Sequence, residues 1–383
     1  MPLTKADHLD RTRTPKRVLA LDGGGIRGIL TLEYLGVIED VLRKRTGRAD
    51  LVLSDYFDLI GGTSTGSIIA AALACGLTVA DLKSLYREIG GTVFHPSFIR
   101  GTFLGGTLVP KFPSDAVRRA LDAHLGADTT LDGDRIRTGL MVMTKRLDTG
   151  SPWPLHNHPD APYAAQDGKL LLTQIVRAST AAPTYFAPER IAISSRDGEV
   201  VDGAFVDGGV SPFNDPALQL LMVAIVHGHG FRWQTGADDL LLISVGTGTY
   251  KQKYTAEALV GMVAAKQGIC ALQSLMDDCA RMNQAVLQLL TASLTPWKID
   301  RAFGDMAADS ASGPKLATYA RYNVLLEPEW LATTVKVAYD ADRIAKIAAM
   351  DDPTNMDDLA EIGKLAAAIQ VKPEHFPARF DLA

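Results

Sequence analysis

Two short apolar segments near the start of the chain each lead through a glycine-rich turn into a helical pattern. Residues 18–21 precede Asp22-Gly23-Gly24-Gly25, and residues 56–60 precede Gly61-Gly62-Thr63-Ser64-Thr65-Gly66. The helical patterns that follow cover residues 29–45 and 67–75. Strands that alternate with helices predict a mainly parallel sheet with helices on both faces, because each parallel connection has to cross the sheet.

Later segments extend this pattern along the chain. Further strands are predicted at residues 139–144 and 240–245, and a hairpin is predicted over residues 191–201. Long helical patterns over residues 256–294 and 340–371 predict a helical C-terminal third. We therefore expect an α/β fold with a mainly parallel central sheet flanked by helices in three layers.

The domain organisation is expected to be simple. Residues 1–16 are polar and predict a flexible N-terminal arm. Residues 17–383 contain no Pro-, Gly- or Ser-rich linker and no internal repeat. A single domain is therefore expected over residues 17–383, and it includes the C-terminal helices from about residue 254 to the end.

Composition argues against several classes of protein. The net charge of -5 gives no electrostatic basis for binding a nucleic-acid polymer, which usually requires a basic surface. The three cysteines show neither a disulfide framework nor metal-ligand spacing, which favours a reducing compartment. No apolar signal segment opens the sequence, and no segment offers about 20 uninterrupted apolar residues for a bilayer-spanning helix. We expect a cytoplasmic protein that meets a membrane only peripherally, at its inner face.

The sequence Gly62-Thr63-Ser64-Thr65-Gly66 has the form G-x-S-x-G and lies between a predicted strand and a predicted helix. In this context the motif holds a nucleophilic serine on a sharp turn, with its hydroxyl exposed beside a helix N-terminus. The alternative is a tight turn whose serine only caps the helix. Ser64 is therefore a candidate nucleophile, and Gly62, Thr63, Thr65 and Gly66 form its turn.

A second turn, Gly23-Gly24-Gly25-Ile26-Arg27-Gly28, offers unobstructed backbone N–H groups and one fixed positive charge at a helix start. Such a loop can bind an anion, and in acyl transfer it would form the oxyanion hole. The same residues fit G-x-G-x-x-G, the pattern of dinucleotide-binding loops. A nucleotide-binding fold needs an acidic residue at the end of the second strand, where this chain has Gly61-Gly62-Thr63-Ser64. Neither glycine run continues into the Gly-Lys-Ser or Gly-Lys-Thr of a P-loop.

The third motif, Asp207-Gly208-Gly209, places an acid at the end of an apolar run and in front of a flexible turn. Serine needs a base, because its free hydroxyl is a weak nucleophile at neutral pH. The usual base is a histidine, but only His227, His229 and His375 follow Asp207, and a position at the surface explains each of them. The sequence does not force a Ser-His-Asp triad, and it favours a two-residue arrangement of Ser64 and Asp207.

In this order, the three motifs resemble those of the patatin-like phospholipase family, including its bacterial members. That family has a glycine-rich oxyanion loop, G-x-S-x-G, and a later Asp-Gly-Gly or Asp-Gly-Ala. Other similar segments, which extend the resemblance over roughly residues 17–370, are residues 178–188, 244–248, 321–324 and 350–352. One departure is Phe213-Asn214-Asp215-Pro216, where many relatives have a second asparagine before the proline. Asp215 is therefore expected to alter the local hydrogen bonds.

The resemblance implies a serine acyl hydrolase that cleaves fatty-acyl esters of phospholipids or related lipids at a membrane surface. Ser64 would be the nucleophile, Asp207 its base and residues 23–28 the oxyanion hole, with an acyl-serine intermediate. No metal and no other cofactor is implied. Some bacterial members are membrane-degrading effectors that a cyclic nucleotide activates, so such an activator is a hypothesis for this chain, as is a homo-oligomer.

Two other interpretations stay open at this point. A non-catalytic lipid-binding or scaffold protein could use the same fold, since a fold alone does not confer activity. A dinucleotide-binding Rossmann protein is the second. The apolar segment over residues 94–104 could form a mobile flap over an acyl site or a loop packed on the core.

Overall fold

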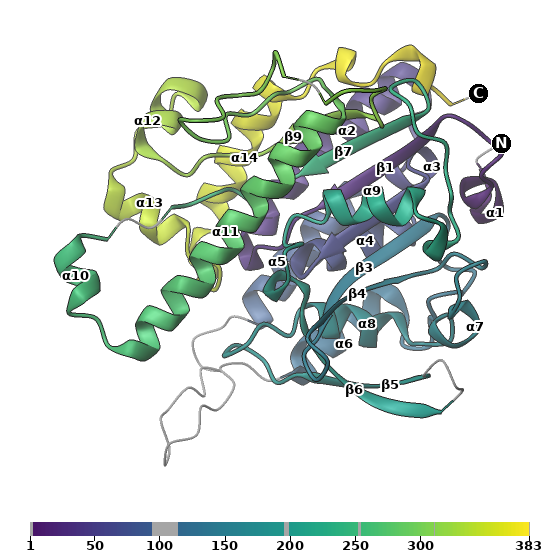
Figure 1. The fold of residues 1–383 in the computed structure, drawn as a ribbon, viewed down its shortest axis with the longest axis horizontal. Helices are drawn as coiled ribbons and strands as arrows, with labels where there is room; N and C mark the ends of the chain where they lie inside the picture. The colour runs from purple at the N-terminus through teal and green to yellow at the C-terminus, as the bar shows by residue number, and fades with distance from the viewer. Residues whose placement is uncertain (1–2, 94–113, 195–198, 252–253, 310, 383) are drawn as a thin grey trace.

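The computed structural model describes residues 3–93, 114–194, 199–251, 254–309 and 311–382. These residues form a nine-stranded sheet in the order β5-β6-β3-β2-β1-β7-β9-β8, and β4 also pairs with β3 (Figure 1). The strands are β1 (Lys16–Leu21), β2 (Leu59–Thr63), β3 (Gly139–Arg146), β4 (Ser151–His156), β5 (Glu189–Ser194), β6 (Val200–Asp207), β7 (Leu240–Val245), β8 (Ala292–Ser293) and β9 (Thr318–Tyr322).

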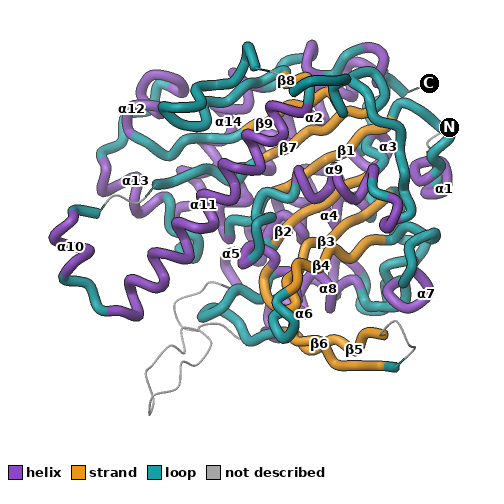
Figure 2. The backbone as a smooth tube through the Cα atoms, in the orientation of Figure 1, coloured by secondary structure: helices purple, strands orange, loops and turns teal. Residues whose placement is uncertain are grey.

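Helices surround the sheet, as the purple segments of Figure 2 show. Within the described residues they are α1 (Lys5–Leu9), α2 (Gly28–Thr46), α3 (Leu53–Tyr56), α4 (Thr65–Ala74), α5 (Val79–Val93), α6 (Ser114–Leu125), α7 (Ala164–Asp167), α8 (Leu172–Ser179), α9 (Ala217–Ile225), α10 (Ala256–Val260), α11 (Ala264–Leu290), α12 (Pro328–Trp330), α13 (Ala341–Ile347) and α14 (Met356–Gln370). Two short 3₁₀ turns matter for the site, η1 (Gly25–Arg27) and η3 (Gly208–Val210).

The centre of the sheet is parallel. β1 pairs in parallel with both β2 and β7, β2 pairs with β3, and β7 pairs with β9. β4, β5 and β6 form the antiparallel part of the sheet. The carboxyl ends of the parallel strands therefore meet at one edge, which is where ligands bind in open α/β sheets.

Alternate residues of β1 enter two separate cores. Leu19 and Leu21 pack in a cluster that contains buried residues of α2, α4 and α14. Val18 and Ala20 pack in a second cluster that contains residues of α9 and Leu287 of α11. Both faces of the sheet are thus covered, and the predicted three-layer α/β fold is confirmed.

The N-terminal segment differs from the prediction of a flexible arm. α1 packs on the body of the protein, because the side chains of His8 and Leu9 are buried. His8 Nδ1 lies 2.9 Å from Asp58 Oδ1, and Lys16 Nζ donates to the carbonyl oxygen of His8 at 2.6 Å. Polar residues can be buried here because Asp58 supplies a buried counter-charge, which the composition of the segment alone does not reveal.

The second predicted strand lies three residues later than expected. Residues 53–56 are helical, and β2 begins at Leu59 and continues through Gly61 and Gly62. A Cβ atom on Gly61 would lie 2.7 Å from Leu220 Cδ2 of α9, so a glycine in this strand lets the helix approach closely.

Most of the remaining predicted elements are present, and β4, β8 and β9 are strands that were not predicted. β3 and β7 coincide with predicted strands, and β5 and β6 form the predicted hairpin, whose turn lies outside the described residues. The last third of the chain is mainly helical, but it also supplies β9 and the short β8, which lies at the end of the segment 256–294 predicted to be helical. Because β9 pairs with β7, this part of the chain belongs to the same sheet as β1.

Candidate active site

Ser64 occupies a strained turn between β2 and α4. Its φ of 52° and ψ of -126° lie in a region that side chains other than glycine rarely adopt. A Cβ atom on Gly62 would lie 2.1 Å from the carbonyl oxygen of Gly66, and one on Gly66 would lie 2.2 Å from the carbonyl oxygen of Leu21. The two glycines of the motif are therefore required by close backbone approach, and the turn presents Ser64 at the carboxyl end of the strand.

A buried acid contacts the hydroxyl of this serine. Ser64 Oγ donates a hydrogen bond of 2.6 Å to Asp207 Oδ2, and the N–H of Gly209 donates one of 2.7 Å to Asp207 Oδ1. Asp207 ends β6 and is only 5% exposed. Burial raises the pKa of Asp207 to about 6, against the opposing effect of the hydrogen bonds from Ser64 and Gly209. The carboxyl group is therefore ionised at neutral pH, yet basic enough to accept a proton.

Ser179 fixes the backbone of the turn, a role that was not predicted for it. The N–H of Ser64 donates to Ser179 Oγ at 2.9 Å, and Ser179 Oγ donates to the carbonyl oxygen of Met143 at 2.6 Å. Ser179 lies at the end of α8, and Met143 lies on β3. The only signal in the sequence was that Ser179 belongs to the family-like segment 178–188.

The glycine-rich turn passes beside the nucleophile. A Cβ atom on Gly23 would lie 3.1 Å from Ser64 Cβ, so the two turns are in close contact. The carbonyl oxygen of Gly25 accepts hydrogen bonds from Thr65 Oγ1, at 3.0 Å, and from the hydroxyl of Tyr86. These bonds fix the orientation of the glycine-rich turn relative to α4, which carries Thr65, and α5, which carries Tyr86.

The N–H groups of this turn are not equivalent. The N–H of Gly23 donates to the carbonyl oxygen of Asn214 at 3.1 Å, and that of Ile26 donates to the carbonyl oxygen of Met350 at 2.9 Å. Among the hydrogen bonds of the described residues, none uses the N–H of Gly24 or of Gly25. Of the six residues predicted to form an anion site, these two glycines keep their donors available.

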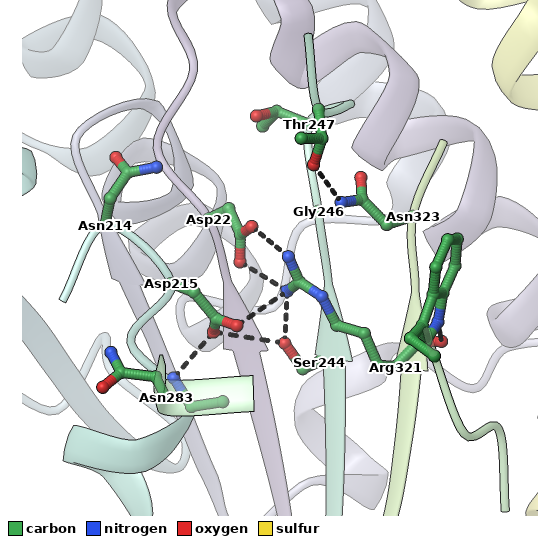
Figure 3. Close-up of polar contacts among 12 residues, drawn as sticks. Asp22, Asn214, Asp215, Ser244, Gly246, Thr247, Asn283, Arg321 and Asn323 are labelled. Carbon is green, nitrogen blue, oxygen red and sulfur yellow. Dashed lines mark hydrogen bonds and ion pairs between the residues drawn. The ribbon is translucent and has the colours of Figure 1, made fainter. Parts of the chain in front are cut away.

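A buried ion-pair cluster lies directly behind the glycine-rich turn. Arg321 Nη1 donates to Asp22 Oδ1 at 2.7 Å and to Ser244 Oγ at 2.6 Å, and it lies 3.3 Å from Asp215 Oδ2. Figure 3 shows the guanidinium group of Arg321 between the two carboxylates. Arg321 lies on β9, Ser244 on β7 and Asp22 just after β1, so the cluster joins three adjacent strands. The other carboxylate oxygen of Asp215 accepts a hydrogen bond from Ser244 Oγ at 3.4 Å.

The loops on both sides of this cluster are tied together through one carbonyl group. The carbonyl oxygen of Gly23 accepts hydrogen bonds from Thr247 Oγ1 at 2.8 Å and from Asn214 Nδ2 at 3.4 Å. A Cβ atom on Gly24 would lie 2.2 Å from Thr247 Oγ1, so no larger residue fits there without rearrangement. Thr247 and Asn214 thus position the first two glycines of the turn.

The remaining motif residues complete the junction of the three segments. Thr63 Oγ1 donates to the carbonyl oxygen of Phe213 at 2.6 Å, which joins β2 to the loop after Asp207. A Cβ atom on Gly208 would lie 2.3 Å from the carbonyl oxygen of Met143, and one on Gly28 would lie 2.3 Å from Thr65 Cγ2. The structure therefore brings all three predicted motifs together.

A cavity of about 1270 Å³ opens over Ser64, Asp207 and the glycine-rich turn. Arg27 lines it, and burial lowers the pKa of Arg27 to about 10, so this residue still carries a positive charge at neutral pH.

Within the described part of the chain, no histidine lines the cavity. His375 instead contacts Tyr322, and His229 contacts His156. The apolar segment 94–104 lies outside the described residues.

The described residues contain no group of three or more His, Cys, Asp or Glu side chains placed to hold a metal ion. In the same residues, every helix is too short or too polar to cross a bilayer.

The site combines three features: a serine on a strand-to-helix turn, a buried acid that contacts it, and a glycine-rich turn beside it. Residues 19–221 match the family model described as patatin-like phospholipase. The chain belongs to the patatin-like phospholipase family.

Individual relatives agree with this assignment. Over 207 residues the chain is 33% identical to a cGAMP-activated phospholipase of Escherichia coli, in a match that covers 54% of this chain and 55% of the relative. It is 30% identical over 253 residues to a cGAMP-activated phospholipase of Vibrio cholerae, with 64% and 68% covered. It is 31% identical over 282 residues to patatin group J-1 of Solanum tuberosum, with 68% and 70% covered. The chain thus spans about half the length of the E. coli relative.

Proposed function

We propose that this protein hydrolyses fatty-acyl esters of phospholipids or related lipids through a dyad of Ser64 and Asp207. The observation that carries the proposal is the 2.6 Å hydrogen bond from Ser64 Oγ to the buried carboxylate of Asp207. Membership of the patatin-like phospholipase family supports the choice of a lipid ester as substrate. The cavity above the pair, at about 1270 Å³, leaves room for an acyl chain.

In the first half of the reaction, Ser64 Oγ attacks the ester carbonyl carbon while its proton passes to Asp207 Oδ2. The negative charge that develops on the carbonyl oxygen is stabilised by the available N–H groups of Gly24 and Gly25, with the charge of Arg27 nearby. The tetrahedral intermediate collapses to an acyl-serine, and the leaving alcohol takes the proton from Asp207. The second half repeats these steps with water as the nucleophile and Asp207 again as the base.

The pKa of Asp207 suits this role. A carboxylate with the ordinary pKa of 3.8 would be a weak base toward a hydroxyl group, whereas a value of about 6 brings it closer to the working pH. Each oxyanion donor can contribute about 3 to 4 kcal/mol to the stability of the transition state. The proposal therefore assigns the rate acceleration to a positioned base and two preorganised donors.

The test compares the wild-type protein with Ser64→Ala and Asp207→Asn on a soluble short-chain ester and on phospholipid vesicles. Matched controls are Ser84→Ala, an exposed serine on α5, and Asp202→Asn, an exposed acid on the same strand as Asp207. We expect both site variants to lose at least about 1000-fold in kcat/KM, and both controls to keep wild-type activity. A folded Ser64→Ala variant that still hydrolyses both substrates would rule out the dyad.

We also propose that a cyclic nucleotide activates the enzyme, and that it then attacks phospholipids at the cytoplasmic face of the inner membrane. Two relatives named cGAMP-activated phospholipases support this regulation. The measurement is vesicle hydrolysis with and without a panel of cyclic di- and trinucleotides. If hydrolysis is equally fast with and without each cyclic nucleotide, the proposal of activation is wrong, whereas the proposal of hydrolysis is unaffected.

The alternative functions make different predictions. A scaffold protein would bind lipid without hydrolysis in the assay above, and it would not need the contact between Ser64 and Asp207. A dinucleotide-binding protein would be stabilised against heat by nicotinamide cofactors. Gly61, Gly62 and Thr63 at the end of β2 leave no acid there for a ribose, which disfavours the nucleotide site.

A further inference from the structure

We propose that α10 and the first half of α11 form the surface that docks on a phospholipid bilayer and admits lipid to the cavity. We call residues 256–275 the α10–α11 hairpin. In Figure 1, α10 and the start of α11 project away from the sheet. The inference rests on the proposed function, because it concerns the route by which a lipid substrate reaches Ser64.

Exposed apolar side chains are concentrated on this hairpin. Of the fifteen large apolar residues exposed in the described part of the chain, six lie between residues 259 and 275. They are Leu259 at 39%, Val260 at 85%, Val263 at 75%, Ile269 at 52%, Leu272 at 42% and Leu275 at 58% exposure. Single exposed apolar residues need no explanation, but a cluster of this kind usually marks an interaction surface.

The hairpin also lies at the opening of the cavity. Leu259, Ile269 and Leu272 line the cavity that contains Ser64, although each of them is more than one third exposed. These three residues must therefore form part of the rim. An acyl chain that left a bilayer at this point would meet apolar side chains on its way to Ser64. A protein partner bound to the same residues would cover the opening instead.

The charges of the hairpin suit a membrane surface. Residues 256–275 contain only two charged residues, Glu257 and Lys266, and both are exposed. Two more exposed lysines, Lys251 and Lys298, line the cavity. Helices that lie in a membrane interface combine an exposed apolar face with cationic residues, and they bind anionic lipids most strongly. α11 is not apolar enough to cross a bilayer, so docking would be interfacial.

The experiment uses the double variant Val260→Asp/Val263→Asp, because neither residue lines the cavity. The matched control is Val200→Asp/Val226→Asp, two exposed valines on β6 and at the end of α9, neither of which lines the cavity. Binding is measured by flotation with vesicles of ether-linked phosphatidylglycerol and phosphatidylethanolamine, which contain no acyl ester to hydrolyse. Turnover of a soluble short-chain ester is measured in parallel.

We expect the wild-type protein and the control variant to bind these vesicles, and the hairpin variant to bind them at least about tenfold more weakly. Turnover of the soluble ester should be the same in all three proteins. Equal vesicle binding by the hairpin variant, or no binding by the wild type, would overturn the inference. Sedimentation velocity gives a further result against it. If the wild type is a dimer and the hairpin variant is a monomer that binds vesicles equally well, the hairpin joins two copies of the chain and does not dock on lipid.

The two proposals fail separately. If the wild type hydrolyses no ester, either alone or with the panel of cyclic nucleotides, but binds vesicles through the hairpin, the proposed hydrolase activity is wrong and the docking surface stands. If it hydrolyses the soluble ester but the hairpin variant binds vesicles normally, the activity stands and the docking surface is wrong.

Discussion

Replacement of Asp207 by asparagine should abolish hydrolysis and stabilise the fold. The reason is that the carboxylate is buried at the end of β6, where its negative charge is partly desolvated. Asparagine has nearly the same shape. Its carbonyl oxygen can accept from the N–H of Gly209, and its amide group can donate to Ser64 Oγ, so both contacts of the side chain survive.

The magnitude follows from the pKa of Asp207. Burial raises this pKa from 3.8 to about 6 in the folded protein. At about 1.36 kcal/mol for each pH unit, the ionised side chain costs the folded state about 3 kcal/mol at pH 8. Because the folded pKa is raised, this cost is absent below pH 3.8, grows as the pH rises toward 6, and is constant above that. Asp207→Asn should therefore gain about 3 kcal/mol at pH 8 and much less at pH 4.

Urea unfolding at pH 8 and at pH 4 checks this expectation, and kcat/KM on the soluble ester is measured with the same preparations. Asp202→Asn is the control, because Asp202 lies on the same strand but is exposed. A variant that is less stable than the wild type at pH 8, or equally stabilised at both pH values, would refute the argument from desolvation.

Three further predictions concern the same site and the core. Because Asp207 must be ionised to act as a base, kcat/KM should fall about tenfold from pH 7 to pH 5, and a flat profile would exclude it as the base. Arg321→Met leaves Asp22 and Asp215 buried without a cation and should cost about 3 to 5 kcal/mol in urea unfolding, whereas Asp215→Asn, which keeps the Asp22 pair, should cost far less. Burial lowers the pKa of His156 from 6.5 to about 3, so its titration leaves stability unchanged well above pH 6.5 and reduces it by about 2 kcal/mol at pH 5. His156→Gln should remove that part of the pH dependence of unfolding.

The fold was predictable where the signal was local. Apolar runs that end in glycine turns identified β1 and β7, and the G-x-S-x-G motif located Ser64 on its turn. The end of β2 was misplaced because Gly61 and Gly62 read as turn residues, whereas close packing by α9 and α4 places them in the strand. Its start was misplaced because the apolar Tyr56 ends the helix α3. β9 was missed because its five residues carry no turn signal, and its place in the sheet depends on pairing with β7.

The site was predictable only in part, for a related reason. Ser64, Asp207 and the glycine-rich turn belong to contiguous motifs that can be read one by one. Arg321 acts on Asp22 across 299 positions of sequence, and no local pattern links the two. Similarly, His8 is buried against Asp58, which lies 50 positions later in the sequence. Because no local pattern shows this contact, the polar N-terminal segment was predicted to be a free arm.

The pairing of β1 with β7 sets a limit on which parts of this protein can be exchanged. The family model ends at residue 221, before β7 and β9. A fragment that ended there would leave one side of β1 unpaired in the middle of the sheet, and such edges promote aggregation. It would also lack Thr247 and Arg321, which hold the glycine-rich turn from behind. The three motifs are therefore not a transferable module, and a chimera with a relative would have to keep residues 240–322 together with residues 16–221.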